Sequence, residues 1–111
     1  MNCHIRPTAQ AEADIERLYA SIGERRGEAV ARQWYESYTG AVARLRAMPL
    51  SCGVAYENPR FVEELRHLLF GLPRNRRYRA LFVIRGEEVV ILAVRAPGER
   101  PLLPGEVKER E

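Results

Sequence analysis

The stretch Arg76–Arg95, RRYRALFVIRGEEVVILAVR, decides the fold of this chain. It contains two runs rich in Val, Ile, Leu and Phe, separated by the tetrapeptide RGEE at 85–88. Branched and aromatic side chains fit the pleated surface of a strand, and Gly86 accepts the positive φ of a tight turn. The stretch therefore predicts a β-hairpin made of the two central strands of a sheet.

Alternation along each strand assigns the hairpin side chains to two faces. The expected faces are Ala80, Phe82 and Ile84 against Arg79, Leu81, Val83 and Arg85 in the first strand, and Val90, Leu92 and Val94 against Val89, Ile91, Ala93 and Arg95 in the second. Both faces are apolar in the middle and carry arginine at the ends. We therefore expect helices to cover one face, and the uncovered face to gather arginine into one electropositive concavity.

Composition limits the class of protein. A chain of 111 residues suits one domain with a single core. It has no run of about 18–20 apolar residues, as a membrane span needs, and its start lacks the apolar core of a signal peptide. Cys3 and Cys52 form no CxxC motif, which favours two reduced thiols. We expect a cytoplasmic protein that does not bind a membrane.

The net charge of +3 is unevenly distributed. Residues 60–100 carry nine arginines and five acids, whereas bases and acids balance in residues 1–59. Arginine clustered on a sheet favours partners that present phosphate or carboxylate groups.

The segments before the hairpin predict a short strand followed by two helices. A strand is expected at 3–6, and a helix at about 8–25 with Thr8 as its N-cap. A second helix should run from about 28 to 48, where Pro49 ends it. A platform for stacking bases is one interpretation of its aromatic side chains, but their helical spacing favours the core: Trp34, Tyr35 and Tyr38.

A loop from 50 to 60 and a strand from Phe61 to Phe70 should precede the hairpin. The order is then β-α-α-β-β-β, an α+β fold with an antiparallel helical hairpin packed on one sheet face and three antiparallel strands at the end. We expect one domain at residues 1–100 and a flexible C-terminal tail at 101–111.

Five segments in this order resemble the RelE/ParE superfamily, the toxins of type II toxin–antitoxin modules. They are ADIERLYASIGERRG (13–27), AVARLRAMP (41–49), ELRHLLFG (64–71), YRALFVI (78–84) and VVILAVR (89–95), followed by Gly98 and Arg100. The resemblance spans about residues 3–102. The long first helix, its Ala13-Asp14 pair and the ELR…YR…F pattern are more similar to the ParE-like branch.

The resemblance implies a toxin of the plasmid-stabilisation type that a cognate acidic antitoxin neutralises. ParE-like members poison DNA gyrase, whereas RelE-like members cut mRNA in the ribosome without a metal. We favour the gyrase-directed role, which would not be enzymatic, and keep the ribosome-dependent mRNA endonuclease as the alternative. A binding module of the same fold without toxicity is a third hypothesis.

The resemblance also implies site residues. Arg79 matches the arginine that nucleases use on the same strand, and Arg100 their C-terminal arginine. Arg66 and His67 stand where the nucleases carry lysine, and no tyrosine follows Tyr78. These departures weigh against cleavage. If cleavage occurs, His67 should carry the proton while Arg66, Arg79 and Arg100 stabilise charge.

Seven arginines are candidates for binding the target or its phosphates: Arg74, Arg76, Arg77, Arg79, Arg85, Arg95 and Arg100. Two structural alternatives stay open. His67, between Leu65 and Leu69, fits a hydrogen-bonded sheet residue, and Arg79 fits a salt bridge to Glu87 or Glu88 across the hairpin. The sequence shows no metal-ligand spacing and no phosphate-binding glycine loop, so we expect no metal, cofactor or small-molecule substrate.

Overall fold

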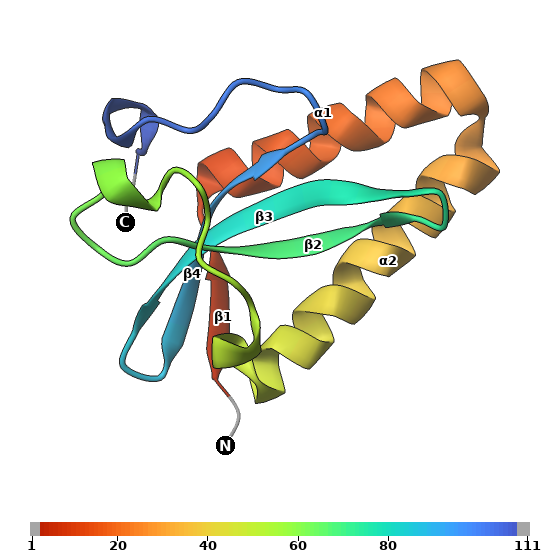
Figure 1. Ribbon diagram of the computed structural model, residues 1–111. Coiled ribbons are helices and arrows are strands. Elements are labelled where there is room, and N and C mark those ends of the chain that lie inside the picture. Colours follow the sequence, from red (N-terminus) through yellow and green to blue (C-terminus); the bar gives the residue numbers. More distant parts are fainter. Residues whose placement is uncertain (1–2, 109–111) are drawn as a thin grey trace.

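Two helices form a hairpin behind a four-stranded sheet in the view of Figure 1. The computed structural model describes residues 3–108. Its helices and strands, in chain order, are β1 (His4–Pro7), α1 (Ala9–Arg26), α2 (Glu28–Ala47), β2 (Arg66–Leu72), β3 (Asn75–Arg85) and β4 (Glu88–Arg95). This order confirms the α+β arrangement expected from the sequence.

The helix ends agree with the sequence signals. The backbone N–H of Ala11 donates to the Thr8 hydroxyl, which caps α1 at 3.1 Å. Gly27, with a φ of +96°, joins the two helices in the conformation that glycine adopts readily. Within the described residues, 3–108, no helix is long and apolar enough to cross a membrane.

The strands lie in the order β1-β4-β3-β2, and β2, β3 and β4 run antiparallel. β1 pairs in parallel with β4, from His4 opposite Glu88 to Pro7 opposite Ile91. The N-terminal strand therefore forms one edge of the sheet, beside the last strand of the chain.

The strand expected at Phe61–Phe70 begins later and ends later than predicted. Residues 61–65 belong to a loop whose backbone is held by other groups. The Leu65 N–H donates to the Asn58 side chain at 2.8 Å, and its carbonyl accepts from the N–H of Ala55. β2 therefore starts at Arg66, once these loop contacts end.

The strict alternation predicted for the second hairpin strand is wrong beyond Ile91, because a β-bulge interrupts the ladder. Leu81 pairs with Ala93 while Phe82 pairs with Ile91, so Leu92 is an extra residue on β4. The bulge moves Val94 to the helix side and Ala93 to the opposite side. It also places Arg95 directly opposite Arg79.

The sheet has an apolar core on each face. The helix-side core includes Trp34 and Tyr38, as predicted, whereas Tyr35 is 41% exposed. The opposite face carries a second cluster: Ala55, Leu65, Leu81, Val83, Val90, Leu92, Ala93 and Leu102. The expected open concavity of arginines is therefore wrong, since the loop before β2 and the C-terminal segment cover this face.

The C-terminal segment contributes Leu102 to that second cluster, with 2% of the residue exposed. A short 3-10 turn follows at Pro104–Glu106. Part of the expected tail, residues 109–111, lies outside the described residues. The domain boundary near residue 100 stays a prediction.

Candidate functional site

Arg79 lies in a buried network rather than on an open surface. Its guanidinium donates to both carboxylate oxygens of Glu57, at 2.9 and 2.8 Å, and to the Tyr56 hydroxyl at 2.9 Å. Both charged residues are buried, with 8% of Arg79 and 3% of Glu57 exposed. The hypothesis of a salt bridge to Glu87 or Glu88 is wrong, because Glu57 from the preceding loop takes that place.

Glu57 also holds the C-terminal segment. Its Oε2 accepts the backbone N–H of Leu102 at 2.9 Å. Burial alone would raise the pKa of Glu57, but the hydrogen bonds from Arg79 and Leu102 outweigh it and hold this pKa below its ordinary value. Burial works against the charge of Arg79 as well, and Glu57 more than compensates, so the pKa of Arg79 is raised. Both side chains therefore remain charged.

Arg95 and Arg100 share the carboxylate of Glu106. Arg95 donates to it at 3.4 Å, and Arg100 forms a close ion pair with it. Arg95 also donates to the backbone carbonyl of Arg100 at 3.3 Å. The short 3-10 turn thus offsets one of the two positive charges of Arg95 and Arg100, two arginines that the sequence offered as phosphate ligands.

Two further candidates pair with acids of the loop before β2. Arg85 contacts Glu63 at 2.7 Å, and Arg66 contacts Glu64 at 3.0 Å and also the Cys52 carbonyl. Both pairs are partly exposed, and such pairs contribute about 0–1 kcal/mol to stability. Exchange of these carboxylates for an anionic partner would cost little.

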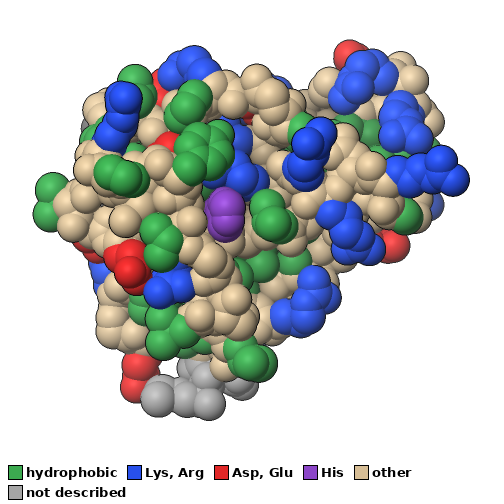
Figure 2. Space-filling view, in the orientation of Figure 1, with side chains coloured by type: hydrophobic (Ala, Val, Ile, Leu, Met, Phe, Trp, Pro, Cys, Tyr) green, Lys and Arg blue, Asp and Glu red, His purple; other side chains and the backbone are tan. Residues whose placement is uncertain are grey.

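Three exposed arginines lie in the β2–β3 turn and at the start of β3, and we call them the arginine tip: Arg74, Arg76 and Arg77. Across residues 3–108, none of the three forms an ion pair with a carboxylate. Arg76 borders a hollow of about 280 Å³ together with Arg44 of α2. Figure 2 shows basic side chains gathered on the side of the molecule where Figure 1 places this turn.

The backbone of Gly71 fixes the arginine tip to α2. Its N–H donates to the Ser37 hydroxyl at 3.0 Å. Its φ is +145°, and a Cβ there would lie 2.1 Å from the Asn75 carbonyl oxygen. Only glycine fits this close approach.

His67 lies on β2 opposite Leu81, and its backbone N–H donates to the Gly53 carbonyl at 3.1 Å. Burial, assisted by the positive charge of Arg79, lowers its pKa, although Glu57 opposes the shift. Its ring Nδ1 is buried and has no hydrogen-bond partner in the described part of the chain. The ring is therefore neutral at pH 7. His67 is a sheet residue, as the structural alternative expected, but the hydrogen bond expected for its side chain is not found at Nδ1.

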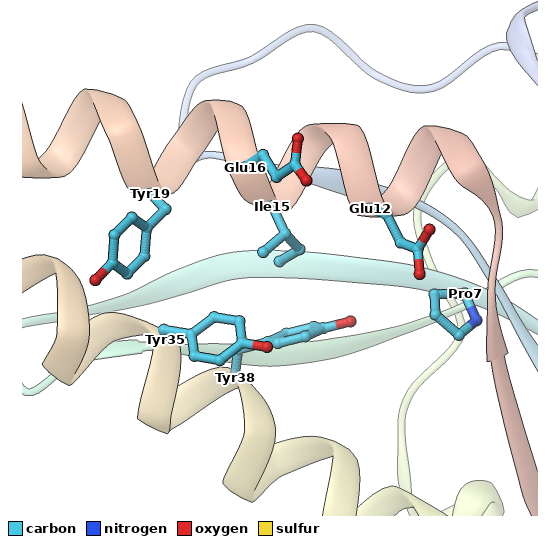
Figure 3. Close-up of a pocket in the computed structure, with 7 residues that line it drawn as sticks. All are labelled: Pro7, Glu12, Ile15, Glu16, Tyr19, Tyr35 and Tyr38. Carbon is cyan, nitrogen blue, oxygen red and sulfur yellow. The ribbon is translucent and has the colours of Figure 1, made fainter.

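A groove of about 680 Å³ runs between the two helices, on the side of α1 and α2 that Figure 3 shows. Glu12, Ile15, Glu16 and Tyr19 of α1 line one wall, and Tyr35 and Tyr38 of α2 line the other. In Figure 3 the Glu12 carboxylate points into the groove, while that of Glu16 points away from it. The groove thus offers aromatic and aliphatic surface with an acidic edge.

The pKa of Tyr38 in this groove is raised to about 12, chiefly by burial and also by neighbouring Tyr35 and Glu12. It therefore stays a neutral phenol at physiological pH. No group of three or more His, Cys, Asp or Glu side chains that would hold a metal ion occurs in the described ranges.

Sequence reasoning missed Tyr56 and Glu57, which organise the Arg79 network. They lie in a stretch marked only by turn residues such as Asn58 and Pro59. Their role is visible only in the folded structure, where both side chains contact Arg79 of β3.

Comparison with known proteins identifies the fold. The family model described as "ParE toxin of type II toxin-antitoxin system, parDE" matches residues 5–100. A solved structure titled "Chromosomal ParDE TA system from P. aeruginosa" superposes with a TM-score of 0.68 and 23% identity, covering 85% of this chain and 95% of that chain. At that identity the likeness shows a shared fold. No curated protein matched this chain.

Proposed function

Because the chain belongs to the ParE toxin family of type II toxin–antitoxin systems, we propose that it inhibits growth by acting on DNA gyrase in the cytoplasm. On this proposal a cognate antitoxin neutralises it, and the arginine tip provides the main contact with the target. Arg85, Arg95 and Arg100 would add to that surface only after giving up their carboxylate partners.

The buried Arg79–Glu57 pair is the observation that favours gyrase over mRNA cleavage. A nuclease needs cations directed at the phosphate as charge develops. Glu57 already occupies the guanidinium of Arg79 with two hydrogen bonds, and little of Arg79 is exposed. His67 is neutral at pH 7 and can accept a proton there. The nearby Arg79, however, is held by Glu57 and is not directed at a phosphate.

Induced expression without antitoxin tests the target. Filamentation and a DNA-damage response are expected. Rapid loss of translation with cleaved mRNA would instead support the endonuclease, and normal growth would support the binding module without toxicity.

Replacing the arginine tip, Arg74, Arg76 and Arg77, by alanine should relieve growth inhibition. Truncated interface contacts of about 1 kcal/mol each together amount to roughly a hundredfold loss of target affinity. Colony counts after induction and gyrase supercoiling by the purified variant measure the effect. A matched variant replaces three exposed helix arginines, Arg25, Arg32 and Arg46, and should stay toxic. Equal relief by both variants would point to net charge rather than to the tip.

The groove between α1 and α2 supports the antitoxin part of the proposal. Amphipathic segments bind such grooves through regularly spaced apolar side chains. The acidic edge at Glu12 suits a docked face that is apolar or basic. An antitoxin that is acidic overall would then place its carboxylates elsewhere, near the arginine tip.

Tyr35→Ala should weaken binding of the cognate antitoxin by about tenfold, the loss typical of an interface aromatic. The variant removes a ring that is 41% exposed and lines the groove. Titration calorimetry measures the affinity. Met48→Ala, at a side chain that is 64% exposed and does not line the groove, serves as the control. Unchanged affinity in Tyr35→Ala would show that the antitoxin does not bind in this groove.

A further inference from the structure

Tyr56 stands between two hollows on the sheet side opposite the helices. One, of about 410 Å³, is lined by Tyr56 together with Arg60, Arg100 and Leu103 among others. The other, of about 510 Å³, is lined by Tyr56 with Leu69, Arg77 and Arg79 among others. A single aromatic ring thus forms the ridge between two basic hollows.

The ring is exposed and yet held in place. It is 61% exposed, while the Arg79 guanidinium lies 4.3 Å from its centroid and donates to its hydroxyl. Arg79 is itself fixed by Glu57. An exposed aromatic of this kind loses little conformational freedom when a flat partner stacks on it.

The charges around the ridge favour an anionic ligand. Arg60 and Arg77 are exposed on opposite sides of Tyr56. The acids that line the hollows are engaged: Glu57 holds Arg79, and Glu99 accepts the Ala96 N–H and pairs with Arg17. The loop that carries Tyr56 and the C-terminal segment run alongside each other at this edge in Figure 1, and both line the first hollow.

We propose that Tyr56 is a stacking platform for unpaired bases, and that this ridge binds single-stranded nucleic acid with Arg60 and Arg77 on its phosphates. Proteins that bind single strands combine stacked aromatic rings with a basic path for the backbone. Each hollow lies within the range of volumes that small ligands occupy, so it has room for a nucleotide. The proposal goes beyond gyrase inhibition and does not depend on it.

Fluorescence anisotropy with short labelled oligouridine and oligothymidine tests the ridge. The protein should bind both, with affinity that falls as salt rises. Tyr56→Ala should weaken binding about fivefold to a hundredfold, which is the range found for loss of one stacked base. Tyr56→Phe loses the hydroxyl hydrogen bond but keeps the ring and its contact with the Arg79 guanidinium, so it should retain most of the binding that Tyr56→Ala loses. Val62→Ala, at a fully exposed apolar side chain of the same loop, should also bind normally.

Arg60→Ala and Arg77→Ala should each lower the slope of affinity against salt, because each removes a phosphate contact. Arg32→Ala, which removes an exposed charge from α2, should leave the slope unchanged. Equal binding by Tyr56→Ala and the wild type, or equally tight binding of duplex DNA, would overturn the proposal. Absence of binding by the wild type would also overturn it. None of these outcomes bears on the gyrase proposal, which the supercoiling assay tests separately.

Discussion

Glu57→Ala should lower the free energy of unfolding by about 3–5 kcal/mol, since it leaves the buried Arg79 guanidinium without its counter-charge. It also removes the acceptor for the Leu102 N–H, so the C-terminal segment should detach from the second cluster, on the sheet face opposite the helices. A small domain is typically stable by about 5–15 kcal/mol, and the variant would approach the unfolding limit. Denaturant titration measures the loss.

Glu64→Ala is the control for this prediction. It removes an exposed carboxylate from a surface pair with Arg66 and should change stability by less than about 1 kcal/mol. A Glu57→Ala variant as stable as Glu64→Ala would mean that the network adds nothing to the fold.

The same pair predicts how stability depends on pH. The pKa of Glu57 is lower in the folded protein than in the unfolded chain, where it is about 4.3. The stabilisation that the charged Glu57 carboxylate provides is therefore fully present above the pKa of the unfolded chain, and it is lost as the pH falls through the folded pKa. The stability gap between the wild type and Glu57→Gln should accordingly narrow on acidification.

Gly71→Ala should destabilise the fold and displace the arginine tip. A non-glycine residue at such a positive φ costs about 1–3 kcal/mol. The added Cβ would also overlap the Asn75 carbonyl oxygen at 2.1 Å, which forces the turn open. Thermal unfolding measures the first effect. Loss of toxicity at a temperature where the variant remains folded measures the second.

Gly40→Ala in α2 provides a control of opposite sign. Its Cβ would meet only the flexible end of Arg44 at 3.9 Å, and alanine favours a helix by about 1 kcal/mol over glycine. If Gly71→Ala were as stable as Gly40→Ala, the β2–β3 turn would be able to accommodate a Cβ at residue 71, contrary to this prediction.

Local pattern predicted most of the fold. Helical spacing placed Trp34 and Tyr38 in the core, and Thr8 and Pro49 marked helix ends, because these signals act over a few residues. The bulge at Leu92 was not predictable from alternation. It depends on contacts from distant residues, since the Val94 N–H donates to Asp14 and the Leu92 carbonyl accepts from Thr8.

The candidate site was predicted less completely. Composition located the arginine-rich half of the chain, yet it did not distinguish the tip arginines from Arg79 and Arg95. That distinction depends on Glu57 and Glu106, which approach from segments far away in sequence. Charge counts contain no information on such pairings.

The parallel pairing of β1 with β4 has a consequence for synthesis. His4 finds its partner only at Glu88, and Leu102 completes the opposite face later still. Contacts so far apart in the chain form late, after most of the polypeptide has left the ribosome. A translation product that ends before Glu88 would therefore lack both the pairing of β1 with β4 and the cover over the opposite face. Translation interrupted there would release an unfolded fragment in place of the folded toxin.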